Sequence, residues 1–117
     1  MEITVETNVE EKYVLIAVSG EIDLGNVGEL KKEVISKIED VTPCNLVVDL
    51  KEVDYIDSTG LGVLIGLRRR VKECDGELYL IVHTPRMEKL FKVTGLVNVF
   101  KICQNVGEAL VEIEKGR

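Results

Sequence analysis

Two consecutive stretches decide the fold: Leu46-Val47-Val48-Asp49-Leu50 and, after residues 51–56, Asp57-Ser58-Thr59-Gly60-Leu61-Gly62. The first is a nearly continuous apolar run, which is typical of a central strand covered on both faces. Residues 51–56 are predicted to form a loop. The apolar spacing after Ser58 predicts a helix that runs to about Cys74, where an Asp-Gly pair stops it. A strand, a loop and a helix are therefore expected in direct succession.

The segments on either side of this unit alternate between strand and helix patterns. The predicted strands are residues 3–6, 13–19, 78–82 and 99–103, and the first two are joined by a hairpin turn over 10–12. The predicted helices begin after a candidate N-cap at Asn26, at Pro85 and at Val106, and the first ends over 40–43. Strands separated by helices pair in parallel through right-handed crossovers, whereas the hairpin adds one antiparallel pair. The predicted fold class is α/β: a small mixed, mostly parallel β-sheet packed with about four helices.

Length and composition restrict the possible functions. The chain has 117 residues, 45% of them hydrophobic, which suits one domain spanning residues 1–117. A net charge of -6 disfavours nucleic acid as a partner. The acidic N-terminus has no signal-peptide pattern, and no apolar run near it is long enough to span a bilayer, so a cytoplasmic protein without membrane contact is expected.

The cysteines and the histidine give no pattern of a metal or disulfide site. Cys44, Cys74 and Cys103 are odd in number and far apart in the sequence, and His83 is the single histidine. A metal site needs several converging ligands, and a disulfide framework usually needs an even number of cysteines. We therefore expect buried or incidental thiols and no bound metal or cofactor.

Ser58 stands where the predicted loop turns into its helix. Unpaired backbone N–H groups and the positive end of the helix dipole favour a phosphate there. The pattern leaves two interpretations open, an N-cap and a phosphoacceptor. Glycines at 60, 62 and 66 each cost about 1 kcal/mol relative to alanine in a helix, so a close approach to the sheet or to a partner chain is expected. Apolar residues cover most of the helix circumference, which predicts an exposed apolar docking surface near Ser58.

Three other chemistries fit the residues less well. A serine hydrolase would have only His83 as its base, and Ser58 is not in a Gly-x-Ser-x-Gly turn. The glycines at 60, 62 and 66 do not have the spacing of a dinucleotide-binding loop, and no P-loop is present. A response-regulator receiver needs an acidic pair after its first strand, whereas Asp49 lies within a strand and no such pair occurs.

The segment Asp57-Ser58-Thr59-Gly60-Leu61-Gly62 resembles, at every position, the Asp-Ser-(Ser/Thr)-Gly-Leu-Gly signature of the STAS domain in bacterial anti-sigma factor antagonists. Gly20-Glu21-Ile22-Asp23 resembles the Gly-Glu-(Leu/Ile)-Asp that follows the second strand of that family. Residues 45–50 resemble its central strand. The element order and the length also agree, so the resemblance covers nearly the whole chain and implies the STAS fold.

This resemblance implies a regulator of transcription rather than an enzyme. In the family, the unphosphorylated antagonist binds an anti-sigma factor that is also a serine kinase, and this binding releases the sigma factor. The kinase phosphorylates the motif serine with ATP and magnesium, which ends the binding, and a serine phosphatase reverses the modification. Carried over, Ser58 is the phosphorylation site of a phosphoprotein. The implied partner-binding residues are Asp23, Asp57, Ser58, Thr59, Gly60, Leu61 and Gly62.

Phosphorylation would add about -1.5 to -2 charges beside Asp23, Asp54 and Asp57. A helix N-terminus tolerates that charge in the free protein, but a tightly packed partner surface does not. The expected switch is therefore local, with binding lost and the fold kept. The alternative within the family is a STAS adaptor subunit of a stress-signalling or lipid-transport complex, without a phospho-switch and with Ser58 as a helix cap.

Overall fold

A five-stranded mixed sheet, in the order β1-β2-β3-β4-β5, runs through the computed structural model, which describes residues 1–41 and 44–116. The strands are β1 (Glu2–Asn8), β2 (Tyr13–Ile22), β3 (Asn45–Ile56), β4 (Leu78–Ile81) and β5 (Lys101–Cys103). The helices are α1 (Val27–Ile38), α2 (Ser58–Glu73), α3 (Pro85–Val93), the short 3₁₀ helix η1 (Leu96–Asn98) and α4 (Val106–Lys115). The β1–β2 hairpin is antiparallel, and every other neighbouring pair is parallel. The predicted α/β fold and order of elements are confirmed.

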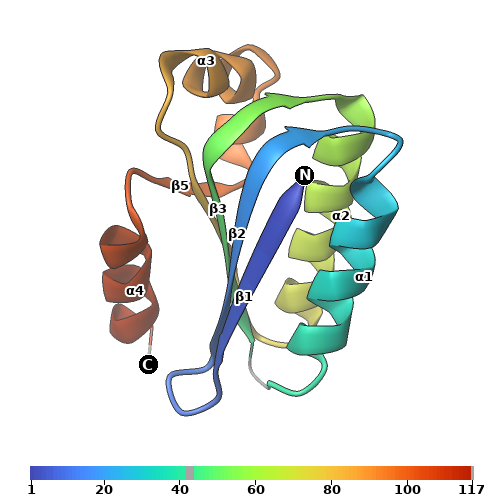
Figure 1. Cartoon of the computed structure of the whole chain (residues 1–117). Helices are drawn as coiled ribbons and strands as arrows, with labels where there is room; N and C mark the ends of the chain where they lie inside the picture. Colours follow the sequence, from blue (N-terminus) through green and yellow to red (C-terminus); the bar gives the residue numbers. More distant parts are fainter. Residues whose placement is uncertain (42–43, 117) are drawn as a thin grey trace.

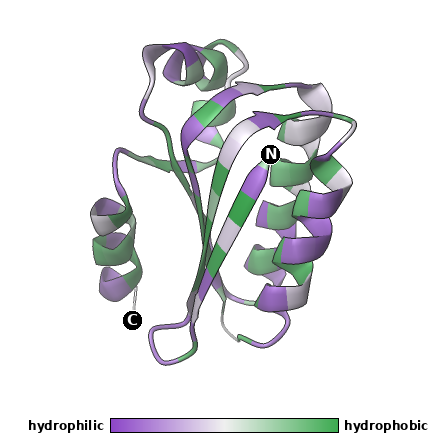
Figure 2. Cartoon of the chain, in the orientation of Figure 1, coloured by the Kyte–Doolittle hydropathy of each residue, from purple (hydrophilic) through white to green (hydrophobic). Residues whose placement is uncertain are grey.

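The helices form two unequal layers on the sheet (Figure 1). Helices α1 and α2 lie side by side on one face, α4 lies on the other, and α3 lies at one end of the molecule. Hydrophobic residues follow the helix faces turned toward the sheet, while hydrophilic residues follow the outer faces (Figure 2). One consequence is that the central strand has a helix layer on both sides.

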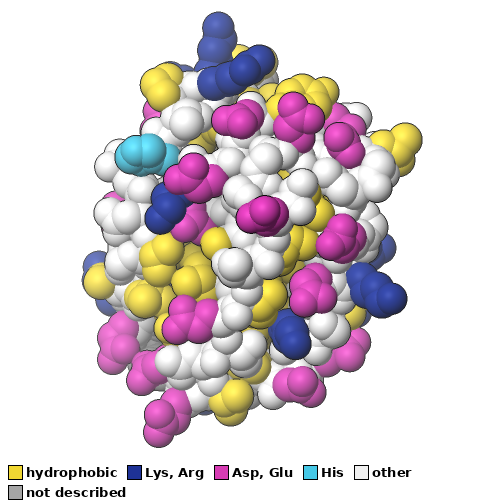
Figure 3. All heavy atoms as spheres, in the orientation of Figure 1, with side chains coloured by type: hydrophobic (Ala, Val, Ile, Leu, Met, Phe, Trp, Pro, Cys, Tyr) yellow, Lys and Arg dark blue, Asp and Glu magenta, His cyan; other side chains and the backbone are white. Residues whose placement is uncertain are grey.

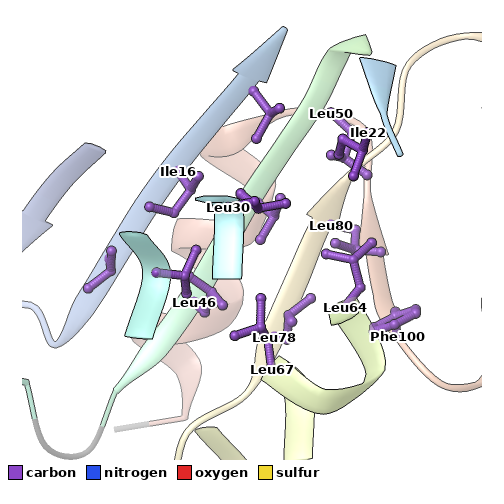
Figure 4. Close-up of a cluster of buried hydrophobic side chains, with 14 of the residues drawn as sticks. Ile16, Ile22, Leu30, Leu46, Leu50, Leu64, Leu67, Leu78, Leu80 and Phe100 are labelled. Atoms are coloured by element: carbon purple, nitrogen blue, oxygen red, sulfur yellow. The ribbon is translucent and has the colours of Figure 1, made fainter. Parts of the chain in front are cut away.

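The main core fills the space between the sheet and the α1–α2 layer. Ile16, Leu46 and Leu80 from the sheet meet Leu30 of α1 and Leu64 of α2, all fully buried (Figure 4). A smaller cluster forms beneath α4, where Val47, Tyr79 and Ile81 of the sheet pack with Ala109 and Ile113 of the helix. Successive residues of β3 enter different clusters, which is why its sequence is apolar without alternation.

The prediction that residues 51–56 form a loop is wrong, because β3 continues to Ile56. Its first half pairs with both β2 and β4, but from Glu52 onward it pairs with β2 alone. Val53 and Ile56 remain buried, while Asp54 is exposed. Charged residues are tolerated in the second half because one edge of the strand there has no neighbouring strand.

The element boundaries differ from the prediction at other places too: β1 and β2 are longer than the predicted 3–6 and 13–19, and β4 ends one residue before the predicted 82. α1 ends at Ile38 with Glu39 as its C-cap, and the expected end of this helix at 40–43 falls partly on residues 42–43, which lie outside the described residues. The last strand is shorter than the predicted 99–103, because Gly95 adopts a left-handed φ of 77° and begins η1 before β5. The predicted helix starts at Pro85 and Val106 are confirmed.

Candidate functional site

Ser58 is the first residue of α2 and is exposed to solvent. The N-cap is the preceding residue, Asp57, whose Oδ1 accepts hydrogen bonds from Gly60 N at 3.0 Å and Thr59 Oγ1 at 2.5 Å. The interpretation of Ser58 as the N-cap is therefore wrong. Within the described chain the Ser58 side chain makes no hydrogen bond, so its hydroxyl is not needed to hold the helix start.

The Asp57 carboxylate also joins two loops that are distant in sequence. Its Oδ2 accepts a hydrogen bond from Leu24 N at 3.1 Å, and Asp57 N donates to Ile22 O at 3.1 Å. The loop after β2 is thereby held against the start of α2. The Thr59 hydroxyl and the Gly60 N–H hold the pKa of Asp57 below its ordinary value, because both donate to the charged carboxylate.

The loop after β2 is a tight turn with its own hydrogen bonds. Asp23 Oδ1 accepts from Gly25 N at 2.9 Å, and Asn26 Oδ1 accepts from Asp23 N at 3.0 Å. Asn26 Nδ2 donates to Glu21 O at 2.8 Å. Asn26 stands at the N-cap position of α1, as predicted, but its side chain caps no helix N–H and stabilises this turn instead. Asp23 lies in the turn that Asp57 holds, although no hydrogen bond joins Asp23 to Ser58 in the described residues.

The glycines of the motif have different structural roles. A Cβ atom on Gly60 would lie 2.6 Å from Ile56 Cγ1 and 2.9 Å from Ile22 Cγ2, so the first turn of α2 rests directly on the ends of β2 and β3. Gly62 and Gly66 are exposed, and a Cβ there would meet nothing within 4 Å. The close approach predicted from these glycines is thus confirmed at Gly60 alone.

The apolar surface near Ser58 comes mainly from elements other than α2. Leu61, Val63 and Ile65 of α2 are partly buried against the main core. Leu24, whose backbone N–H is hydrogen-bonded to Asp57, is 75% exposed, and Tyr55 near the end of β3 is 48% exposed. Sequence reasoning missed both residues. An apolar Leu24 directly after the acidic residue of the Gly-Glu-Ile-Asp segment was the available signal.

The rival chemistries have no assembled site in the described residues. His83 is exposed after β4 and shares no hydrogen bond with Ser58. Asp49 is buried in β3, where its carboxylate accepts from Lys51 N at 3.0 Å and lies 3.4 Å from Lys51 Nζ. The glycines at 62 and 66 lie inside a helix rather than in a phosphate-binding loop. In the residues that the structure describes, no group of three or more metal-ligating side chains is present.

The three cysteines form no disulfide. Cys44 and Cys103 are buried and Cys74 is exposed, all three as free thiols. Burial raises the pKa of Cys44 to about 12, with Cys74 adding a smaller contribution.

Among the described helices, none combines the length and the apolar character needed to cross a bilayer.

Comparison with known proteins agrees with this geometry. The family model of the STAS domain matches residues 2–109, nearly the whole chain. The chain therefore belongs to the STAS domain family.

Within this family, the chain is similar to proteins named as anti-sigma factor antagonists. The anti-sigma-B factor antagonist of Staphylococcus aureus is 33% identical over 102 residues, which cover 87% of this chain and 94% of that protein. The crystal structure of an anti-sigma factor antagonist from Mycobacterium paratuberculosis superposes with a TM-score of 0.81 at 25% identity, covering 97% of this chain and 95% of that one. The phosphorylated form of the Bacillus cell fate determinant SpoIIAA shares the fold, with a TM-score of 0.70 at 24% identity over 96% of this chain and 99% of its own.

Proposed function

We propose that this protein is an anti-sigma factor antagonist that is switched by phosphorylation of Ser58. The unphosphorylated form binds an anti-sigma factor with serine kinase activity, and so releases the sigma factor. Phosphorylation ends this binding, and a serine phosphatase restores it. The protein acts in the cytoplasm as a single STAS domain over residues 1–117, without catalysis of its own and without a cofactor.

The observation that carries the proposal is the separation of two tasks at the start of α2. Asp57 provides the side-chain cap, while the exposed hydroxyl of Ser58 makes no hydrogen bond in the described chain. A kinase can therefore modify Ser58 without breaking any bond that holds the helix. The relatives named as antagonists and the phosphorylated form of SpoIIAA support the same interpretation.

The electrostatics of the site support a local switch. A phosphate of about -1.5 to -2 charges at Ser58 is stabilised by the N-terminal dipole of the 16-residue helix α2 in the free protein. The same phosphate lies next to the charged Asp57 carboxylate, whose pKa is lowered by its hydrogen bonds. A partner that packs against this surface removes water from both groups. Desolvation and repulsion then oppose binding while the fold persists.

The proposed binding residues divide by what they do. Ser58 and Gly62 are exposed and offer direct contact, and Thr59 is half-buried beside them. Asp57 holds the Leu24 turn in place. Asp23 stabilises the turn after β2 through its bond from Gly25 N. Gly60 lets the first turn of α2 lie against Ile56 and Ile22, and Leu61 packs against the main core.

The proposal is tested by incubating the purified protein with the anti-sigma factor of the same organism and magnesium ATP. Intact mass and peptide mapping are expected to show one phosphoryl group, on the Ser58 peptide. Ser58→Ala is expected to remain unmodified, whereas the control Ser36→Ala, which removes an exposed serine of α1 outside the site, is expected to be modified like the wild type. A phosphoryl group on another residue, or none on the wild-type protein, contradicts the phospho-switch.

A further inference from the structure

An apolar groove lies between the end of β3 and helix α3, directly beside the Ser58 site. Its cavity measures about 320 Å³. The side chains of Ile56 and Met87, both nearly inaccessible, belong to its lining, together with Tyr55, Leu90 and Val93. The proposed function does not require this groove, and no residue of α3 was among the predicted site residues.

Two of the lining side chains are among the exposed large apolar residues of the described chain. Val93 is 75% exposed and Tyr55 is 48% exposed. Exposed apolar residues at the edge of a concave apolar surface are typical of protein–protein contact sites. A side chain that enters such a groove excludes water from the apolar residues on both of its sides. The groove is thus suited to an apolar side chain of another protein.

The charges at the edge of the groove indicate what accompanies that apolar side chain. Arg86 and Lys89 on α3 line the groove, and neither forms an ion pair with any described residue. Asp54 lines the opposite edge, on β3. Lys and Arg side chains stand at the α3 end of the molecule beside hydrophobic ones, with acidic side chains close to them, and side chains of both charges are spread over the rest of the visible face (Figure 3). Arg86 and Lys89 thus place two positive charges on the α3 side of the groove, while Asp54 on the β3 side and Glu88 on α3 are acidic.

The groove is continuous along the chain with the proposed phosphorylation site. Tyr55 and Ile56 immediately precede the cap residue Asp57, and Gly60 rests on Ile56. A partner that covers Ser58 is therefore adjacent to the groove without any rearrangement of the fold.

We propose that the groove between β3 and α3 receives an apolar side chain of the anti-sigma factor, with an acidic residue of that partner placed against Arg86 and Lys89. This inference rests on the proposed function, because the occupant is the same partner. It adds a second contact area, on α3, that gives the complex affinity independent of Ser58.

The test is a titration of the purified protein with the anti-sigma factor of the same organism. Val93→Glu is expected to weaken binding by about tenfold or more, because the new carboxylate would lose water against the entering apolar side chain. The matched control Val111→Glu places the same charge on α4, at a valine that is 54% exposed, and is expected to leave the affinity within about twofold. Arg86→Glu with Lys89→Glu is expected to weaken binding, and this effect is expected to shrink at high salt.

Each outcome of this titration decides one claim. Equal affinities of Val93→Glu and Val111→Glu overturn the groove proposal while the proposed function stands. A loss with Val93→Glu but none with the charge reversals overturns the acidic character of the partner segment. Absence of binding by the wild-type protein overturns the proposed function and the groove together. If Val93→Glu does not fold by circular dichroism, Tyr55→Ser tests the opposite wall of the groove with the same readout.

Discussion

Replacing Gly60 by alanine tests how closely α2 is seated on the sheet. The added Cβ would lie 2.6 Å from Ile56 Cγ1 and 2.9 Å from Ile22 Cγ2, both of which belong to the buried core. Distances under 3.0 Å cannot persist, so these side chains or the helix must shift. By contrast, Gly62→Ala and Gly66→Ala add a methyl group that meets nothing within 4 Å.

The magnitudes follow from two opposing effects. Alanine in place of glycine stabilises a helix interior by about 0.5–1 kcal/mol, which is the full expected effect at Gly62 and Gly66. At Gly60 this gain is opposed by an overpacking cost of about 1–3 kcal/mol. We expect Gly60→Ala to lower the free energy of unfolding by about 1–2 kcal/mol, because the contacted Ile56 atom is not at the flexible end of its side chain.

Urea denaturation followed by circular dichroism measures all three variants under identical conditions. With an m-value of about 2 kcal/mol/M, the Gly60→Ala midpoint falls by about 0.5–1 M, while the other two midpoints rise by about 0.3–0.5 M. A Gly60→Ala variant as stable as Gly66→Ala would refute the close seating of α2 on β2 and β3.

Three further predictions concern stability at acid pH, the reactivity of the cysteines and the packing of the core. Asp57→Asn is expected to make the free energy of unfolding less dependent on pH in acid. The pKa of Asp57 is lower in the folded than in the unfolded protein, so its charged form stabilises the fold above the unfolded pKa of about 3.9. This stabilisation is lost as the pH falls through the folded-state pKa. Unfolding curves from pH 7 to pH 2 that match the wild type would contradict it. A maleimide at pH 7 is expected to label Cys74 rapidly and the buried Cys44 and Cys103 slowly, so a Cys74→Ser variant that still labels rapidly would be inconsistent with the structure. Phe91→Ala is expected to cost about 3–5 kcal/mol of unfolding free energy, because Phe91 is 1% exposed and packs edge-on against Phe100; a loss below about 1 kcal/mol in urea would argue against that packing.

The fold was predictable because its main signals are local and strong. Each signal is made of residues that are close together in the sequence. Examples are the apolar run 46–50, the helical spacing of apolar residues after Asn26 and the helix start at Pro85. The continuation of β3 to Ile56 was not predictable in the same way. Three of its residues from 51 to 56 are charged, which hides the strand pattern, and the pairing with β2 that extends the strand is a tertiary feature.

The position of the motif at the start of a helix was predictable from the sequence, but what each of its side chains does there was not. Ser58 and Asp57 are both frequent N-cap residue types, and sequence alone does not show which of them precedes the first helical turn. The bond from Leu24 N to Asp57 Oδ2 joins residues 33 positions apart, so no local pattern indicates it. The apolar groove likewise depends on α3 lying next to the end of β3, which is a tertiary feature.

The central claim is that one phosphate on Ser58 ends partner binding without unfolding the chain, and its most direct test is a paired calorimetric titration. The anti-sigma factor of the same organism is titrated with the unphosphorylated protein and with the Ser58-phosphorylated protein. ADP replaces ATP in both titrations, so that no phosphoryl group is transferred to Ser58 during the measurement. We expect the phosphorylated form to bind about a hundredfold more weakly or worse, since like charges brought together at an interface cost several kcal/mol, while the far-ultraviolet circular dichroism stays the same. Equal affinities of the two forms would contradict the account.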